Sequence, residues 1–405
     1  MTFDGFFLLL HPMYLFNPDN DLALANFNPN FTAPASARKL RSDLSLLPIW
    51  YAPNEAFVIS DGDLNNEYLA FLKDKLPFNN TLISFAELNK FSSRTIKPWG
   101  WSPALRKQLI QKGIDEQAVP SLADIKLIRN YSSRQNAVRI LEELKELNPT
   151  FCGRSYFYTD IDQLLNYVYS AKGDQVLKMP YSGSGKGIVW IKGAITGKQI
   201  DWCKRVINTQ DGIVIEPVLN KVQDFAMEFE VADAGIQYVG YSLFQSAASG
   251  AYVGNLLLPD TEIENVLSKY VTFDLLSQLR KALINKLTTY FPLYRGFLGV
   301  DMMICQTNDF TYQLQPCVEV NVRMNMGIVA HRIYQRFVHS HSSGMYSINY
   351  FKHEDEAQQF EKKMKSESPL TIEGDKIKNG HLSLTPVDKD TRYIACVSIK
   401  NKNEV

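Results

Sequence analysis

Residues 318–323 alternate between apolar and polar side chains, which predicts a β-strand with one apolar face. Every second residue is valine, and the residues between them are an acid, an amide and a base: Glu319, Asn321 and Arg323. Since successive side chains of a strand point to opposite faces, these three should share one face. Carboxylate and amide oxygens suit Mg2+, and a guanidinium binds phosphate or carboxylate with two parallel hydrogen bonds. The face is therefore a candidate binding surface, and an ordinary polar strand face is the alternative.

A second strand precedes this one and is expected to end at Asp301. Residues 306–311 between the two strands contain an Asn-Asp pair, which is typical of a turn. A hairpin over this turn would bring Asp301 close to Glu319 and Asn321.

The first 120 residues alternate between short apolar runs and helix-like segments. Strands are expected at 13–16, 56–60 and 81–85, with a helix at 66–75. Strands that alternate with helices indicate an α/β unit with a parallel sheet, whose binding loops lie at the strand ends.

The remaining chain divides by its pattern into further segments. Helices are expected at 133–147, 160–170 and 354–365, and the stretch 214–338 is rich in strand patterns. We expect two or three domains, because 405 residues exceed what one hydrophobic core usually supports, and we divide the chain into four parts. The boundaries that we predict are 1–125, 126–215, 216–345 and 346–405.

A glycine-rich loop lies between two expected strands, 175–178 and 188–191. The Walker A motif is excluded, because Lys186 is followed by glycine rather than Ser or Thr, and a strand rather than a helix comes next. Glycines let backbone N–H groups point into a concavity that binds anions, and Lys178 would add a positive charge. The alternatives are a mobile hairpin and, for Lys186, a solvated loop lysine.

Composition narrows the class of protein. Formal net charge is 0 and charged residues make up 21% of the chain, so general nucleic-acid binding has little support. The 5 cysteines form no paired motif, which favours buried thiols in a reducing compartment. The apolar run at residues 6–10 lacks a basic flank and is too short to span a membrane. We expect a cytoplasmic protein whose folded sequence begins near Met13.

Taken in order, three features resemble the ATP-grasp superfamily of carboxylate–amine ligases. They are Lys178-x-Pro with its glycine loop, Gly299-Val300-Asp301, and Glu319-x-Asn321-x-Arg323. The resemblance covers residues 133–332 and implies an α/β (α+β) ATP-grasp fold with an N-terminal pre-ATP-grasp domain.

The resemblance implies a role for each matching residue. ATP would be the nucleotide and Mg2+ the metal, with Mn2+ as a second candidate; the metal ligands would be Asp301, Glu319 and Asn321. Arg323 and Lys178 would stabilise charge in catalysis. Glu216 and Val218 match the segment that meets adenine. Asp224 matches the ribose acid, with Glu228 as the runner-up and a solvated strand face as the alternative. The remaining nucleotide contacts would be Arg134, Ser182, Gly183, Ser184 and Gly185. Arg134 stands where the family usually has a lysine.

The function implied is ATP-dependent activation of a carboxylate as an acyl-phosphate, which an amine or similar nucleophile then attacks. The expected partners are small-molecule carboxylates and amines, with a peptide as a further candidate, and neither nucleic acid nor a membrane. The alternative is a non-catalytic nucleotide sensor or scaffold with the same fold.

Overall fold

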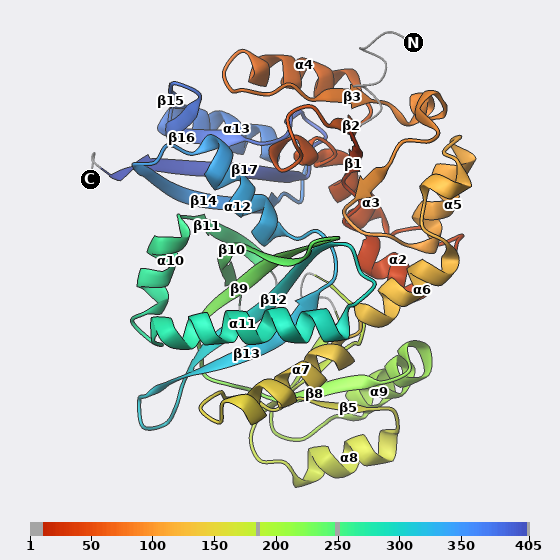
Figure 1. The fold of residues 1–405 in the computed structure, drawn as a ribbon, viewed down its shortest axis with the longest axis vertical. Coiled ribbons are helices and arrows are strands. Elements are labelled where there is room, and N and C mark those ends of the chain that lie inside the picture. The colour runs from red at the N-terminus through yellow and green to blue at the C-terminus, as the bar shows by residue number, and fades with distance from the viewer. Residues whose placement is uncertain (1–10, 184–186, 248–251, 403–405) are drawn as a thin grey trace. The chain divides into compact units, whose positions relative to one another are not determined.

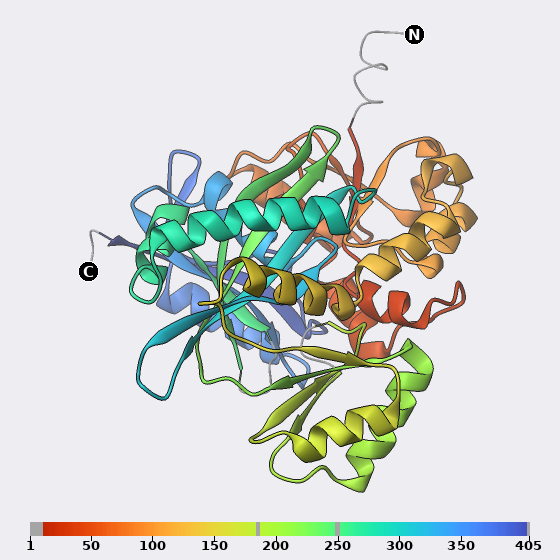
Figure 2. The same cartoon turned by 60° about the horizontal axis from the view of Figure 1, so that its bottom comes forward.

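The computed structural model describes residues 11–183, 187–247 and 252–402, and this part of the chain forms two compact units. Unit 1 comprises 1–126, 253–259 and 324–405, and unit 2 comprises 127–252 and 260–323. Figures 1 and 2 follow the elements of each unit along the chain. The C-terminal segment thus folds with the N-terminal one, while our finer domain boundaries stay a prediction.

The N-terminal part of unit 1 is built on a parallel four-stranded sheet in the order β3-β2-β1-β4. The strands are β1 (Met13–Leu15), β2 (Phe57–Ile59), β3 (Thr81–Ile83) and β4 (Ile96–Pro98). The helices around them are α2 (Asn20–Asn26), α3 (Ala35–Asp43), α4 (Asp63–Lys73), α5 (Pro103–Gln111) and the start of α6 (Leu122–Tyr131). The predicted parallel sheet is confirmed.

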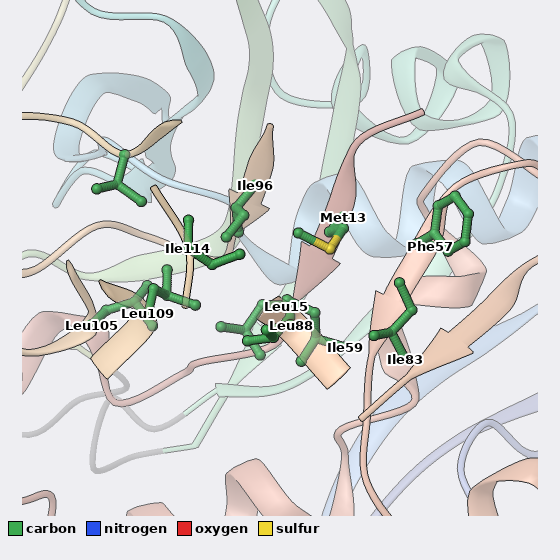
Figure 3. Packing of buried hydrophobic residues seen from close by; sticks show 11 residues of the cluster. Met13, Leu15, Phe57, Ile59, Ile83, Leu88, Ile96, Leu105, Leu109 and Ile114 are labelled. Atoms are coloured by element: carbon green, nitrogen blue, oxygen red, sulfur yellow. The ribbon is translucent and has the colours of Figure 1, made fainter. Parts of the chain in front are cut away.

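Apolar residues of these strands and of α5 form one buried core, shown in Figure 3. All three residues of β1 and of β2 are buried. Short, wholly apolar strands of this kind are typical of parallel sheets covered on both faces.

The C-terminal part of unit 1 is antiparallel, with strand order β11-β14-β17-β16-β15. Its strands are β11 (Tyr252–Leu257), β14 (Ser342–Tyr350), β15 (Thr371–Glu373), β16 (Lys376–Ser383) and β17 (Tyr393–Asn401). Its helices are α12 (Met326–Phe337) and α13 (Glu356–Glu367). The helix expected at 354–365 is confirmed as α13.

Unit 2 contains a small sheet in the order β5-β8-β6-β7. The elements are β5 (Tyr156–Tyr158), β6 (Gln175–Lys178), β7 (Ile188–Ile191) and β8 (Ile213–Pro217), with helices α8 (Ile161–Ser170) and α9 (Gly197–Gln210). The strands on either side of the glycine loop, β6 and β7, pair antiparallel. The predicted strand–loop–strand arrangement is therefore confirmed.

Unit 2 also contains the antiparallel strands β13-β12-β9-β10. They are β9 (Lys221–Ala232), β10 (Gly235–Ser246), β12 (Gly296–Gln306) and β13 (Tyr312–Asn321). The helices of this part are α7 (Arg134–Leu147), α10 (Asp260–Leu267) and α11 (Phe273–Tyr290). Figures 1 and 2 show α7 and α11 lying on the same face of these strands.

Helix α7 illustrates how the sequence encodes its own element. Ser133 accepts a hydrogen bond from the Gln135 backbone N–H and so caps the helix. The buried positions recur at helical spacing: Ala137, Ile140, Leu141 and Leu144. This helix places Arg134 in its first turn, where it reaches the candidate site.

Candidate functional site

The hairpin β12–β13 brings the three expected metal ligands together. Asp301 pairs directly with Glu319, and Gly299 pairs with Asn321. The Asn321 amide donates a hydrogen bond to Asp301 Oδ2 over 3.1 Å. The predicted hairpin is confirmed, but the prediction that β12 ends at Asp301 is wrong, because the strand continues to Gln306.

The carboxyl group of Asp301 has a raised pKa. Burial raises its pKa, the Glu319 carboxylate raises it further, and the net value is about 7 despite the Asn321 hydrogen bond and the Arg323 charge. A nearby cation would favour the ionised form of this carboxyl group and lower its pKa.

A β-bulge interrupts the hairpin beside these ligands. Asp301 pairs with Glu319, but Met303 pairs with Gln315, so β13 carries extra residues around Pro316. The Gln315 side chain accepts from the Cys317 N–H (2.7 Å) and donates to the Cys317 carbonyl (3.1 Å). Backbone groups freed by the bulge are thereby satisfied inside the protein.

Arg134 connects the helix α7 with both the glycine loop and β13. Its Nη1 donates to the Met179 carbonyl (2.6 Å) and to Ser182 Oγ (2.7 Å). Its Nη2 donates to the Ser182 carbonyl (3.2 Å) and to Glu319 Oε1 (2.7 Å). A lysine has no such planar fork, so this set of contacts requires arginine.

Lys178 and Glu216 form a buried ion pair between β6 and β8. Lys178 Nζ lies 2.6 Å from Glu216 Oε2, and both side chains are at most 10% exposed. The Ser155 hydroxyl donates to the other carboxylate oxygen of Glu216 over 3.0 Å. Both charges therefore have partners within the fold, as buried charges must.

The other expected nucleotide contacts belong to the glycine loop, to the end of β8 and to β9. Val218, just past β8, is exposed, and Ser182 is buried. Asp224 on β9 pairs with Lys221 Nζ at 2.5 Å and accepts from the Ser246 hydroxyl. Gly183 is described, whereas the expected contacts Ser184 and Gly185 lie outside the described residues.

Cys317 was not singled out by the sequence, yet it lies among the charged groups of the site. Burial raises the pKa of its thiol, the carboxylates of Asp301, Glu216 and Glu319 raise it further, and Lys178 lowers it. The ion pair of the small sheet and the carboxylates of the hairpin therefore both act electrostatically on this thiol. Cys317 lies two positions before Glu319, so the strand pattern predicts that both side chains share one face. This spacing is the only sequence signal that could have identified Cys317.

Among the described residues, no group of three or more His, Cys, Asp or Glu side chains is arranged to hold a metal ion. The candidate set consists of two carboxylates and one amide. Within the same residues, no helix combines the length and apolar character needed to cross a bilayer.

Comparison with solved structures places the fold. The chain is similar to N5-carboxyaminoimidazole synthetase from Staphylococcus aureus in complex with ADP, at 12% identity and TM-score 0.51, covering 98% of this chain and 94% of that one. It is also similar to biotin carboxylase from Campylobacter jejuni in complex with β,γ-ATP, at 9% identity and TM-score 0.51, with 96% and 86% covered. No family model and no curated protein matches. The protein has the ATP-grasp fold.

Proposed function

We propose that this protein is an ATP-dependent ligase that activates a carboxylate as an acyl-phosphate for attack by an amine or similar nucleophile. One observation carries the proposal: in this ATP-grasp fold, Arg134 joins Ser182 of the glycine loop (2.7 Å) to Glu319 Oε1 (2.7 Å), and Glu319 pairs with Asp301 across the hairpin. The similar structures that were solved with ADP or an ATP analogue support a nucleotide as the common ligand.

The polar groups of unit 2 suit the parts of ATP. Lys178 and Arg134 offer positive charge for the phosphates, and Ser182, Gly183, Ser184 and Gly185 belong to the glycine loop that would cover them. Glu216 and Val218 would meet the adenine, and Asp224 the ribose. Lys178 would exchange part of its contact with Glu216 for a phosphate oxygen.

Mg2+ fits the donor set of the hairpin, with Mn2+ as a second candidate. Asp301, Glu319 and Asn321 all carry oxygen donors, and Mg2+ favours one or two carboxylates plus phosphate oxygens. The raised pKa of Asp301 supports a cation at this point, since a nearby positive charge would favour its ionised form. The metal would neutralise charge on the phosphates.

The proposed reaction has two steps. An oxygen of the substrate carboxylate attacks the γ-phosphorus of ATP, the bond from phosphorus to the bridging oxygen breaks, and ADP leaves. The nitrogen of an amine then attacks the acyl carbon, phosphate leaves, and the amine loses a proton. The protein mainly positions these groups and stabilises charge, with Arg323 placed near Asp301 to offset negative charge on the transferred group.

A screen of carboxylate and amine pools for Mg2+-dependent ADP formation tests the proposal. With a productive pair found, 18O in the substrate carboxylate should appear in the released phosphate. Glu319→Gln should lower turnover at least about 100-fold, the range for a lost charge-stabilising group. Glu146→Gln, an exposed position on α7, should leave it unchanged. AMP as product, or unlabelled phosphate during turnover, would contradict the mechanism.

A non-catalytic nucleotide sensor or scaffold is the second candidate, and one observation favours it. Glu319 is already engaged by Arg134 at 2.7 Å, so a metal must share or displace this contact. ATP binding measured by calorimetry, without ADP formation for any acid in the screen, would identify the sensor. The cytoplasmic location and the small-molecule partners stay predictions.

A further inference from the structure

A polar pocket lies in unit 1, and neither the proposed reaction nor any comparison accounts for it. Its volume is about 340 Å3, within the range of small-ligand sites. The lining comes from the loop after β1, from α2 and the loop at 29–33, from α3, and from the length of α5. All of its lining residues lie within 17–111, so the pocket is formed inside unit 1.

The topology of the parallel sheet explains why a pocket forms here. The chain proceeds from β1 to β2 and β3 on one side, and then crosses back to place β4 on the other side of β1. At such a switch point the loops leaving two neighbouring strands diverge and open a crevice at their carboxyl ends. Asn17 follows β1 and Ser102 follows β4, and both line the pocket.

The loops around the crevice are fixed by specific contacts. The Asn17 side-chain amide donates to the Gly100 carbonyl over 2.8 Å, which joins the loops after β1 and β4. A Cβ at Gly100 would lie 2.2 Å from the amide nitrogen of Asn20, so only glycine permits this approach. Arg38 donates to the Ala33 carbonyl over 2.7 Å, and Lys107 donates to Asn30 Oδ1 over 2.5 Å. These contacts fix the positions of the loops that line the pocket.

The charge of the lining indicates the kind of ligand. The lining contains three cations, Arg38, Arg41 and Lys107, and one carboxylate, Asp19. The pocket therefore has an excess of positive charge, although the formal net charge of the whole chain is 0. Arg41 lies 3.6 Å from Asp19, so one cation is largely compensated. The partners named above for Arg38 and Lys107, the Ala33 carbonyl and Asn30 Oδ1, are both neutral. A cavity with excess positive charge and several amide and hydroxyl groups suits a small oxyanion.

We propose that this pocket binds a small oxyanion, either a carboxylate or a phosphate group of a polar metabolite. Arg38 and Lys107 would supply the charge-assisted hydrogen bonds, and Asn17 and Ser102 lie where they could contact the polar remainder. This proposal does not rest on the reaction proposed for unit 2.

Thermal unfolding of the full chain, titrated with inorganic phosphate and with succinate, tests the proposal. Sodium chloride at equal ionic strength is the reference, because it screens charge without the geometry of an oxyanion. A saturable rise in Tm with phosphate, succinate or both is expected, and the probe that acts identifies the phosphate or the carboxylate as the recognised group. No saturable rise above the chloride reference with either probe would overturn the proposal.

Variants test whether the rise in Tm comes from binding in this pocket. Arg38→Gln combined with Lys107→Gln should weaken the apparent affinity at least about tenfold, as expected for lost hydrogen bonds to a charged group. Gln108→Trp should weaken it similarly by filling the pocket without removing a positive charge. The exposed control Lys73→Gln should retain the response. Lys178→Ala should also retain it, because that residue lies in unit 2. An unchanged affinity in either pocket variant, or a lost response in Lys178→Ala, would overturn the assignment.

Discussion

Two carboxylates in different units lose water on folding, yet their pKa values move in opposite directions. Asp301 in unit 2 has its pKa raised to about 7, because burial and the neighbouring Glu319 outweigh its hydrogen bond from Asn321. Glu361 in unit 1 is also penalised by burial, but contacts with His381, Lys365 and Ser383 outweigh this and lower its pKa to about 2.

The partners of the two groups account for the difference. Glu361 Oε1 lies 2.8 Å from Lys365 Nζ, His381 Nε2 lies 3.1 Å from Oε2, and the Ser383 hydroxyl donates to the same oxygen. Asp301 has a neutral amide and a second carboxylate beside it, and the Arg323 charge only partly offsets the effect of burial and of Glu319. Burial therefore does not by itself decide the charge of a carboxyl group. A buried acid with a full set of donors stabilises the fold, whereas one whose charge is only partly compensated is available to a ligand.

The third carboxylate of this comparison is Glu216, which forms a buried ion pair with Lys178. Breaking this pair should cause the largest loss in the free energy of unfolding. Lys178→Met leaves Glu216 buried without its cation and should lower the free energy of unfolding by about 3–5 kcal/mol. Urea denaturation at pH 7 measures this loss.

A double variant controls for simple loss of packing. Adding Glu216→Gln to Lys178→Met removes the uncompensated charge and should recover at least half of the lost free energy. If the double variant is no more stable than Lys178→Met, the pair does not act through charge compensation.

The second prediction concerns Glu361, the satisfied member of the comparison. Glu361→Gln should lower the free energy of unfolding at pH 7 by about 3 kcal/mol, because one pKa unit corresponds to about 1.4 kcal/mol. Glu367→Gln changes an exposed carboxylate on the same helix, α13, and should alter stability by less than about 0.5 kcal/mol.

The pH dependence of Glu361 follows from its lowered pKa. Its contribution is fully present above pH 4.5 and is lost as pH falls toward 2, since the unfolded chain binds the proton first. Equal stability of Glu361→Gln and the unmodified protein at pH 7 would refute the assignment.

The third prediction has the opposite sign. A raised pKa at Asp301 means that the folded chain holds its proton longer than the unfolded chain, so stability falls as pH rises from about 4 to about 7. Asp301→Asn removes this penalty and should raise the free energy of unfolding by at least about 1 kcal/mol at pH 8, but not at pH 4.

Urea titrations at the two pH values, without nucleotide or divalent metal, measure the difference. A variant that is less stable than the parent protein at pH 8 would show that Asp301 is already compensated in the free protein. The contrast with Glu361 would then disappear.

Short-range sequence patterns were sufficient to predict the elements that depend on residues close together in the chain. Alternation along β13, the turn at 307–311 and the strands on either side of the glycine loop follow from short-range periodicity. The parallel sheet of unit 1 was predicted for the same reason. The long helix α11 was missed within a stretch that we took to be mainly strands.

The nucleotide-site assignments stay predictions, and the structure adds detail to only some of them. It describes the contacts of Arg134, Lys178 and Asp224, but Ser184 and Gly185 lie outside the described residues. The partner of Arg134, Glu319, is 185 positions away in the chain. No local pattern encodes a contact of that separation.

The sequence by itself determined which residue types share the hairpin face, because the two-residue period of a strand is a property of the backbone. Only the tertiary structure decided how these groups are charged and paired. The bulge at Pro316 shifts the register of β13, Gln315 satisfies the freed backbone groups, and the charged groups of the site raise the pKa of the Cys317 thiol. Protonation depends on desolvation and on charges brought from distant segments, and these exist only once the chain has folded.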